Sequence, residues 1–162
     1  MTPAELLKFL QDFYRETLDL FNARQNIARS VAEYDANNAY QQVIGRQEVH
    51  LQWLADAITD LGGTPPAESA GAREEPAKGG ADAKSLIEAD VRTQQWFLDR
   101  WTPRVATVTN ARDRRMLSLI LGEMREHLRL LQQAYEGRSD LLGRHADGKV
   151  LRGTVMAARP KN

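Results

Sequence analysis

The chain has 162 residues, a length typical of one domain, and its 22 Lys and Arg residues balance 22 Asp and Glu residues. A net charge of zero gives no broad positive field, so we expect no binding to nucleic acid or to an anionic membrane. Cysteine is absent, which excludes disulfides, thiolate metal sites and cysteine nucleophiles. No apolar run approaches the roughly 18 residues of a membrane span, and the first residues lack a signal-like apolar core. We therefore expect a soluble, cytoplasmic protein.

Glycine and proline gather in one stretch of the chain. Residues 62–81 contain 5 of the 11 glycines and 3 of the 6 prolines, which predicts a linker. The long segments on either side, 4–61 and 82–136, contain few glycines or prolines and carry apolar residues at helical spacing. Both segments are therefore predicted to be helical.

The first segment, residues 4–61, is too long to be a single helix of a small domain. One straight helix of that length would be a rod of about 90 Å, so the segment must turn back on itself. An apolar stripe predicts a first helix over 4–26. Ser30 and Glu33 have the spacing of a capping box, which predicts a turn within 26–30.

The second and third helices are predicted on either side of the linker. The second covers 30–61 and ends at Gly62, which tolerates the positive φ that often terminates a helix. The third covers 82–109, and Pro103 is expected to kink or interrupt it because proline lacks the N–H that a helix interior uses.

The fourth helix is predicted over residues 111–136. Asn110 offers an N-cap, and Gly137 marks the end of the apolar stripe. The pattern as a whole predicts an all-α protein: a four-helix bundle over 1–136, made of two helical hairpins joined by the crossover linker 62–81. Such a crossover lets the second and third helices run parallel.

The composition changes after the bundle. Residues 137–162 hold six Lys or Arg residues against two Asp residues, among short apolar runs. This pattern is typical of a basic, partly extended terminus, and the alternative is a segment that docks on a protein partner.

The second and fourth helices resemble each other in sequence. Placing residues 43–54 over 120–131, at an offset of 77, aligns two aliphatic residues, a glycine, a histidine and two leucines without a gap. The match joins His50 to His127, and it suggests that the two hairpins are an internal repeat.

The architecture and the paired histidines resemble the ferritin-like superfamily, which includes rubrerythrin, bacterioferritin and the di-iron carboxylate proteins. The resemblance implies a Glu-x-x-His pair on each of the second and fourth helices, and a carboxylate on each of the other two. The sequence departs from that motif, because Gln47 stands three residues before His50 and Met124 stands three residues before His127. A paired-iron site needs these carboxylates for charge balance, so we expect none to form and no resident cofactor.

A different metal site can be drawn from the remaining residues. His50, His127 and Glu123 are candidate ligands for one iron or other divalent ion, because Glu123 lies one helical turn before His127. Glu16 and Asp90 flank the stripes of the first and third helices and are further candidates. The alternative is structural: buried histidines that bond to a neighbouring helix, and an ordinary i,i+4 pair.

Two functions remain open. In the first, the chain is a bundle of uncharacterised role that has lost di-iron chemistry and acts as a structural or interaction protein. It would then form a homodimer through a helix face that carries Trp53 or Trp96. In the second, it is a metal-binding redox or iron-handling protein with the rearranged site. The sequence contains no nucleophile-plus-base set, phosphate loop or dinucleotide turn.

Overall fold

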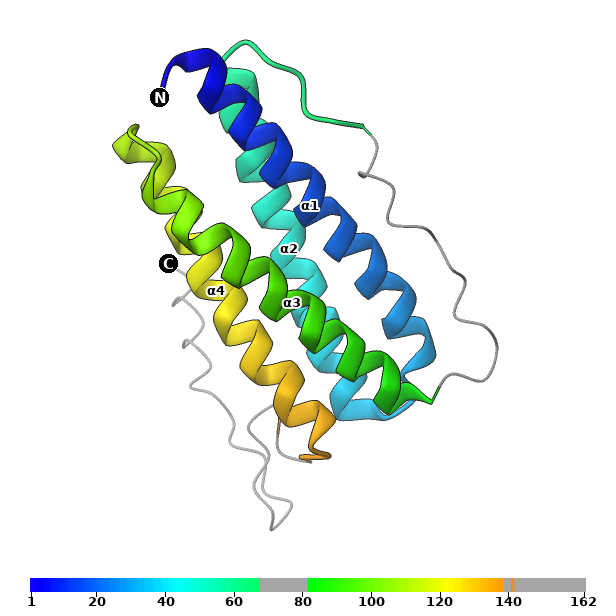
Figure 1. Cartoon of the computed structure of the whole chain (residues 1–162). Helices are drawn as coiled ribbons and strands as arrows, with labels where there is room; N and C mark the ends of the chain where they lie inside the picture. The colour runs from blue at the N-terminus through cyan, green and yellow to red at the C-terminus, as the bar shows by residue number, and fades with distance from the viewer. Residues whose placement is uncertain (68–81, 139–140, 142–162) are drawn as a thin grey trace, which may run out of the picture.

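Four helices form the bundle in the computed structural model, which describes residues 1–67, 82–138 and 141. They are α1 (Pro3–Ser30), α2 (Tyr34–Asp60), α3 (Ala83–Ala106) and α4 (Ala111–Tyr135). Figure 1 shows that α2 ends at one end of the bundle and α3 begins at the other, so these two helices run parallel. The prediction of an all-α four-helix bundle is confirmed. The basic tail and most of the crossover linker lie outside the described residues.

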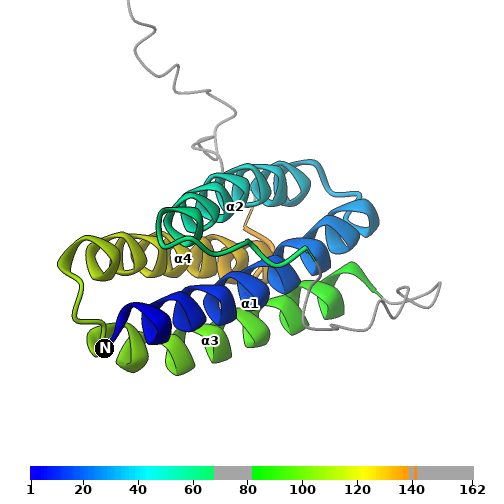
Figure 2. The same ribbon diagram turned by 90° about the horizontal axis from the view of Figure 1, so that it is seen from above.

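The helices pack as two hairpins laid side by side. Besides the contacts within each hairpin, α1 contacts α3 and α4 contacts α2, so α1 and α4 lie on one diagonal and α2 and α3 on the other (Figure 2). No helix within the described residues combines the length and hydropathy of a membrane span.

The turn between α1 and α2 lies later than predicted. The helix α1 continues past residue 26 to Ser30, because Arg24 and Ala28 extend its buried face. The capping box from Ser30 is also wrong. Glu33 is the N-cap, and its carboxylate accepts hydrogen bonds from the backbone N–H groups of Asp35 at 3.1 Å and Ala36 at 2.6 Å.

Helix α3 continues through Pro103 and ends at Ala106, three residues before the predicted end. Burial stabilises this end of the helix, because Val105 in its last turn and Val108 just beyond it pack in the core. The other end signals are confirmed: the Asn110 side chain caps α4, and Gly62 and Gly137 each adopt a φ of +76°.

The core contains two apolar clusters separated by polar side chains. One cluster is rich in aromatic residues, with the rings of Phe13 and Trp101 at 4.9 Å and 70°. The other surrounds Tyr40 and Leu131. Between them lie buried polar residues that we call the polar layer: Arg24, Gln47, His50, Asp90 and Gln94. Because an unbonded polar group costs about 1–3 kcal/mol to bury, this layer is the first place to look for function.

Candidate functional site

The structure places the three proposed metal ligands at neighbouring positions between α2 and α4. His50 is fully buried on α2, and its Nε2 atom lies 2.6 Å from Oε2 of Glu123 on α4. The rings of His50 and His127 stack, with 6.1 Å between their centroids and 28° between their planes. In the described part of the chain, no group of three or more His, Asp or Glu side chains is arranged to hold a metal ion.

Arg46 binds the carboxylate of this group. Its Nε lies 2.5 Å from Glu123 Oε2 and its Nη2 lies 2.6 Å from Oε1, which is a bidentate pair. Hydrogen bonds from Arg46 and then from His50 lower the pKa of Glu123 to about 2. The carboxylate is therefore ionised at neutral pH, and its charge is matched by the guanidinium.

Burial favours the neutral form of both histidines. Burial lowers the pKa of His50, although hydrogen bonding to Glu123 opposes the shift. Burial, and then the charge of Arg24, lowers the pKa of His127 to about 4. The Nδ1 atoms of both rings are buried and have no hydrogen-bond partner among the described residues.

The two further candidates lie elsewhere, between α1 and α3. Glu16 accepts a hydrogen bond from Trp101 Nε1 at 2.7 Å and forms an ion pair with Arg100 at 3.1 Å. Asp90 forms a buried ion pair, with its Oδ2 atom 3.1 Å from Arg24 Nε. Each of these carboxylates is thus partnered by a basic residue of the chain itself.

Arg24 connects three helices through the polar layer. Its Nη2 group donates to Oε1 of Gln94 on α3, and Gln94 Nε2 donates to the backbone carbonyl of Met124 on α4 at 2.7 Å. The path from Arg24 through Gln94 to Met124 ties α1 to α3 and then to α4. A buried cation and its hydrogen bonds therefore lie in the middle of the bundle.

Comparisons with known proteins concern the arrangement of the helices. No family model matches the sequence, and no curated protein matches it either. A crystal structure of a ferritin-like, diiron-carboxylate protein from Bacillus anthracis strain Ames aligns with 83% of this chain and 99% of its own. The TM-score is 0.67 and the sequence identity is 18%. The chain has the ferritin-like fold.

Two buried positions of this ferritin-like bundle decide what its centre can bind. Gln47 and Met124, three residues before the paired histidines, are both fully buried. Both polar atoms of the Gln47 side chain lack a hydrogen-bond partner among the described residues. A neutral amide and a thioether offer a hard metal ion much weaker ligands than two carboxylates would.

Sequence reasoning missed Arg24 and Arg46. Arg24 lies seven residues after Thr17 and four after Leu20, so it continues the buried stripe of α1, but its charge made the stripe look interrupted. Arg46 aligns with Glu123 at the offset of 77. Opposite charges at matched positions of two similar helices were a signal that these side chains meet across the ferritin-like bundle.

The two tryptophans proposed for a contact surface differ in exposure. Trp96 on α3 is 56% exposed, with the guanidinium of Arg100 5.0 Å from its ring centre. Trp53 on α2 is half-buried, and Arg46 lies 4.9 Å from its ring centre. Trp96 is therefore the more available of the two for a partner.

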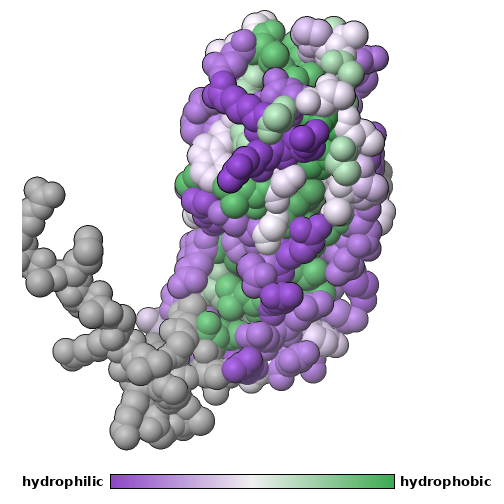
Figure 3. All heavy atoms as spheres, turned by 90° about the vertical axis from the view of Figure 1, so that its left-hand side faces the viewer, coloured by the Kyte–Doolittle hydropathy of each residue, from purple (hydrophilic) through white to green (hydrophobic). Residues whose placement is uncertain are grey.

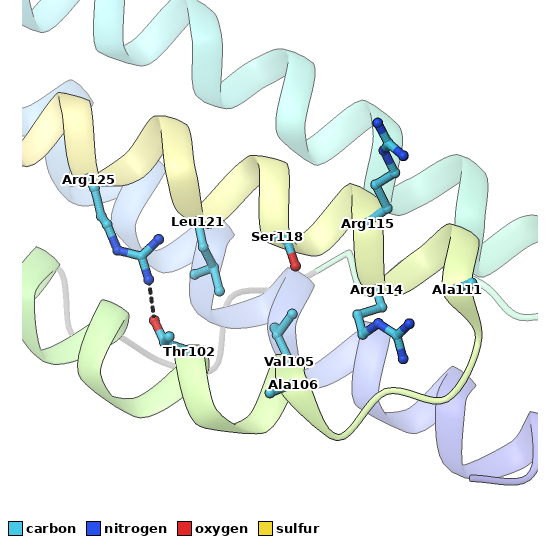
Figure 4. Close-up of a pocket in the computed structure, with 9 residues that line it drawn as sticks. All are labelled: Thr102, Val105, Ala106, Ala111, Arg114, Arg115, Ser118, Leu121 and Arg125. Carbon is cyan, nitrogen blue, oxygen red and sulfur yellow. Dashed lines mark hydrogen bonds between the residues drawn. The ribbon is translucent and has the colours of Figure 1, made fainter.

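A groove follows the line where α3 and α4 meet. Two hollows, of about 770 and 550 Å³, share Thr102 and Arg125 as lining residues. In Figure 4, Arg125 and Arg114 lie toward opposite ends of the larger hollow, with Val105 and Leu121 between them. Figure 3 faces the α4 side and shows hydrophobic patches between hydrophilic side chains along much of this face. We call these hollows the arginine groove; its arginines are Arg114, Arg115, Arg125 and Arg129.

Proposed function

We propose that this ferritin-like bundle has lost di-iron chemistry and acts as a structural or interaction protein. The observation that carries the proposal is the buried ion pair of Arg24 and Asp90, whose side chains are 0% and 2% exposed. The resemblance implies metal cations held by carboxylates at the centre of the bundle. In this chain the cation paired with the buried carboxylate of Asp90 is the guanidinium of Arg24. A second cation close by would be repelled by the guanidinium, which stays charged at any ordinary pH.

The residues present do not fit a paired metal centre. Gln47 and Met124 replace both carboxylates of the Glu-x-x-His pairs. Glu123, Asp90 and Glu16 each bond to a basic side chain, at 2.5, 3.1 and 3.1 Å respectively. Two divalent ions would need several carboxylates free of such partners, because neutral imidazoles bring no negative charge.

The second candidate function is binding of one metal ion at His50, His127 and Glu123, in a redox or iron-handling role. It is favoured by the stacking of the two neutral rings beside Glu123 and by the unpartnered Nδ1 atoms. Neutral imidazole nitrogens are common metal ligands. To act as a ligand, Glu123 would have to weaken its bidentate pair with Arg46.

Metal analysis separates the two functions. Protein purified without chelator, and a second sample dialysed against Fe²⁺ and desalted, would be measured by inductively coupled plasma mass spectrometry. We expect well under one equivalent of iron in both. The double variant His50→Gln/His127→Gln is the matched control, and its iron content should equal that of the wild type.

The opposite result would identify the second function. Near-stoichiometric iron in the wild type, reduced in the double variant, would mean that Glu123 has become a ligand. The protein would then bind one metal ion although it lacks a di-iron site, and the proposal of a purely structural role would be wrong.

We further propose that the chain forms a homodimer through the face of α3 that carries Trp96. The Trp96 side chain is 56% exposed, and aromatic residues are enriched at protein interfaces. Self-association accords with a structural role, and its test is given in the Discussion.

A further inference from the structure

A small hollow lies beside the exposed ring of Trp96, where α1 and α3 run side by side (Figures 1 and 2). Its volume is about 210 Å³. Sites for whole small molecules usually have roughly 300–1,000 Å³, so this one suits a single side chain. Leu20 and Phe97 in its lining are buried core residues, whereas Trp96 and Ala23 are exposed and give the hollow an apolar wall that a partner can contact.

Asp19 brings to this hollow a negative charge that the described residues do not neutralise. It lines the hollow, and its Oδ1 atom is buried without a hydrogen-bond partner among the described residues. The neighbouring carboxylate of Glu16 differs, because it pairs with Arg100 at 3.1 Å. Buried polar atoms are normally hydrogen-bonded, so the free oxygen of Asp19 indicates a donor from outside the chain.

Arg104 is a cation at the same junction of α1 and α3. It lies eight residues after Trp96 on α3, which is about 12 Å along the helix. Its guanidinium lies 4.5 Å from the ring centre of Trp101, and the same ring donates a hydrogen bond to Glu16 of α1. The side chain is exposed, and no carboxylate of the described chain pairs with it. A guanidinium that stacks on a ring still has N–H groups at its edge with which to bind a carboxylate.

The positions of these two charges are complementary between two copies of the chain. In a two-fold dimer each contact occurs twice, so Asp19 of one copy can face Arg104 of the other, and the reverse. An axis that crosses α3 midway between Trp96 and Arg104 passes beside Arg100. The charge of Arg100 is already matched by Glu16 of its own chain, so the two copies of Arg100 do not meet as free charges.

We propose that two copies of the chain associate through the junction of α1 and α3, with their α3 helices antiparallel and with Arg104 of each copy entering the hollow of the other. The guanidinium binds the free carboxylate of Asp19, and the aliphatic part of the side chain lies against the Trp96 ring. The inference rests on the homodimer proposed above, because it names the contacts that hold that dimer together.

The test reverses the two charges one at a time in the full chain. In a dimer of Asp19→Arg, or of Arg104→Glu, both contacts across the axis join like charges. Each variant alone should therefore dimerise at least tenfold more weakly than the wild type in sedimentation velocity. In an equimolar mixture of the two variants, both contacts join opposite charges again. We expect the mixture to form heterodimers with a dissociation constant within threefold of the wild-type value.

Matched controls carry the same changes of charge on the other two helices. Asp56 of α2 and Arg125 of α4 are exposed, and neither forms an ion pair within the described residues. Asp56→Arg and Arg125→Glu should change dimerisation less than twofold, alone or mixed. Circular dichroism and thermal unfolding confirm that all four variants fold.

Three results would overturn the proposal. If both charge variants dimerise like the wild type while Trp96→Ser does not, the dimer is right and the contact between Asp19 and Arg104 is wrong. If both variants are weakened but their mixture does not recover, the two side chains do not meet across the axis. A wild type that is monomeric at micromolar concentration would refute the homodimer itself, and this inference with it. Recovery in the mixture excludes a small organic cation as the occupant, because such a ligand does not join two copies.

Discussion

Arg24 of α1 and Asp90 of α3 form an ion pair that is almost completely buried, 3.1 Å from Nε to Oδ2. Taking two charges out of water costs free energy, so removing either partner would leave the other as an uncompensated buried charge. The pair lies between two apolar clusters, and the Arg24 guanidinium is also bonded to Gln94.

The first prediction concerns this pair. Asp90→Leu should lower the free energy of unfolding by about 3–5 kcal/mol, because it leaves the buried guanidinium without its counter-charge. The double variant Arg24→Met/Asp90→Leu should recover most of that loss, since neither charge remains to be buried. Urea denaturation of the wild type, both single variants and the double variant measures the coupling. Additive losses would show that the two side chains do not depend on each other.

The second prediction concerns acid stability through Glu123. Its pKa is lowered to about 2 in the folded chain, so the carboxylate contributes stability above its ordinary pKa. This contribution is lost as the pH falls from about 4.5 to about 2. Glu123→Gln should therefore flatten the pH dependence in that window relative to the wild type. Unfolding in urea at several pH values gives the comparison.

The third prediction concerns His127, whose folded pKa is lowered to about 4. Between about pH 6.5 and pH 4 the unfolded chain binds a proton there that the folded chain does not. Stability should fall on acidification through this window, with a slope of up to about 1.4 kcal/mol per pH unit from this group. His127→Gln should remove that slope, and at pH 7 it should change stability by no more than about 1–2 kcal/mol. Retention of the full slope in the variant would assign it to other groups.

The fourth prediction concerns self-association. Trp96→Ser should shift the protein from dimer to monomer at micromolar concentration in sedimentation velocity, because it removes the exposed ring of the proposed interface. Leu119→Ser is the matched control, since Leu119 on α4 is 51% exposed but lies on another helix. A wild type that sediments only as a monomer would refute the dimer.

The helices could be predicted from the sequence where each stripe met its own end signal. Gly62, Asn110 and Gly137 mark three helix ends, and each has the predicted role. The end of α1 could not be found this way, because its last buried residues include Arg24, a charge that periodicity treats as surface. Arg24 can be buried because it pairs with Asp90, which lies 66 positions away in the sequence. A local sequence pattern cannot show such a distant partner.

The candidate site could be predicted only in part. The shared offset of 77 brought His50 and His127 to attention, and the structure stacks their rings. The offset in the sequence could not show that Glu123 bonds to Arg46, because that bond depends on how α2 and α4 face each other. From the sequence, Glu123 was expected to interact with His127 on its own helix. In the fold its partners, Arg46 and His50, lie on the neighbouring helix α2.

The hydrogen bonds of Arg24 also fix the register in which the hairpins meet. Leucine and phenylalanine side chains at many levels of α1 and α3 could still pack together if one helix slid past the other by one turn, about 5.4 Å. Because Asp90 and Gln94 lie one helical turn apart on α3, the same slide would leave only one of them opposite the Arg24 guanidinium and would break at least one of its two side-chain hydrogen bonds. Because that state is strongly disfavoured, the polar layer selects one alignment among several that the apolar core would accept.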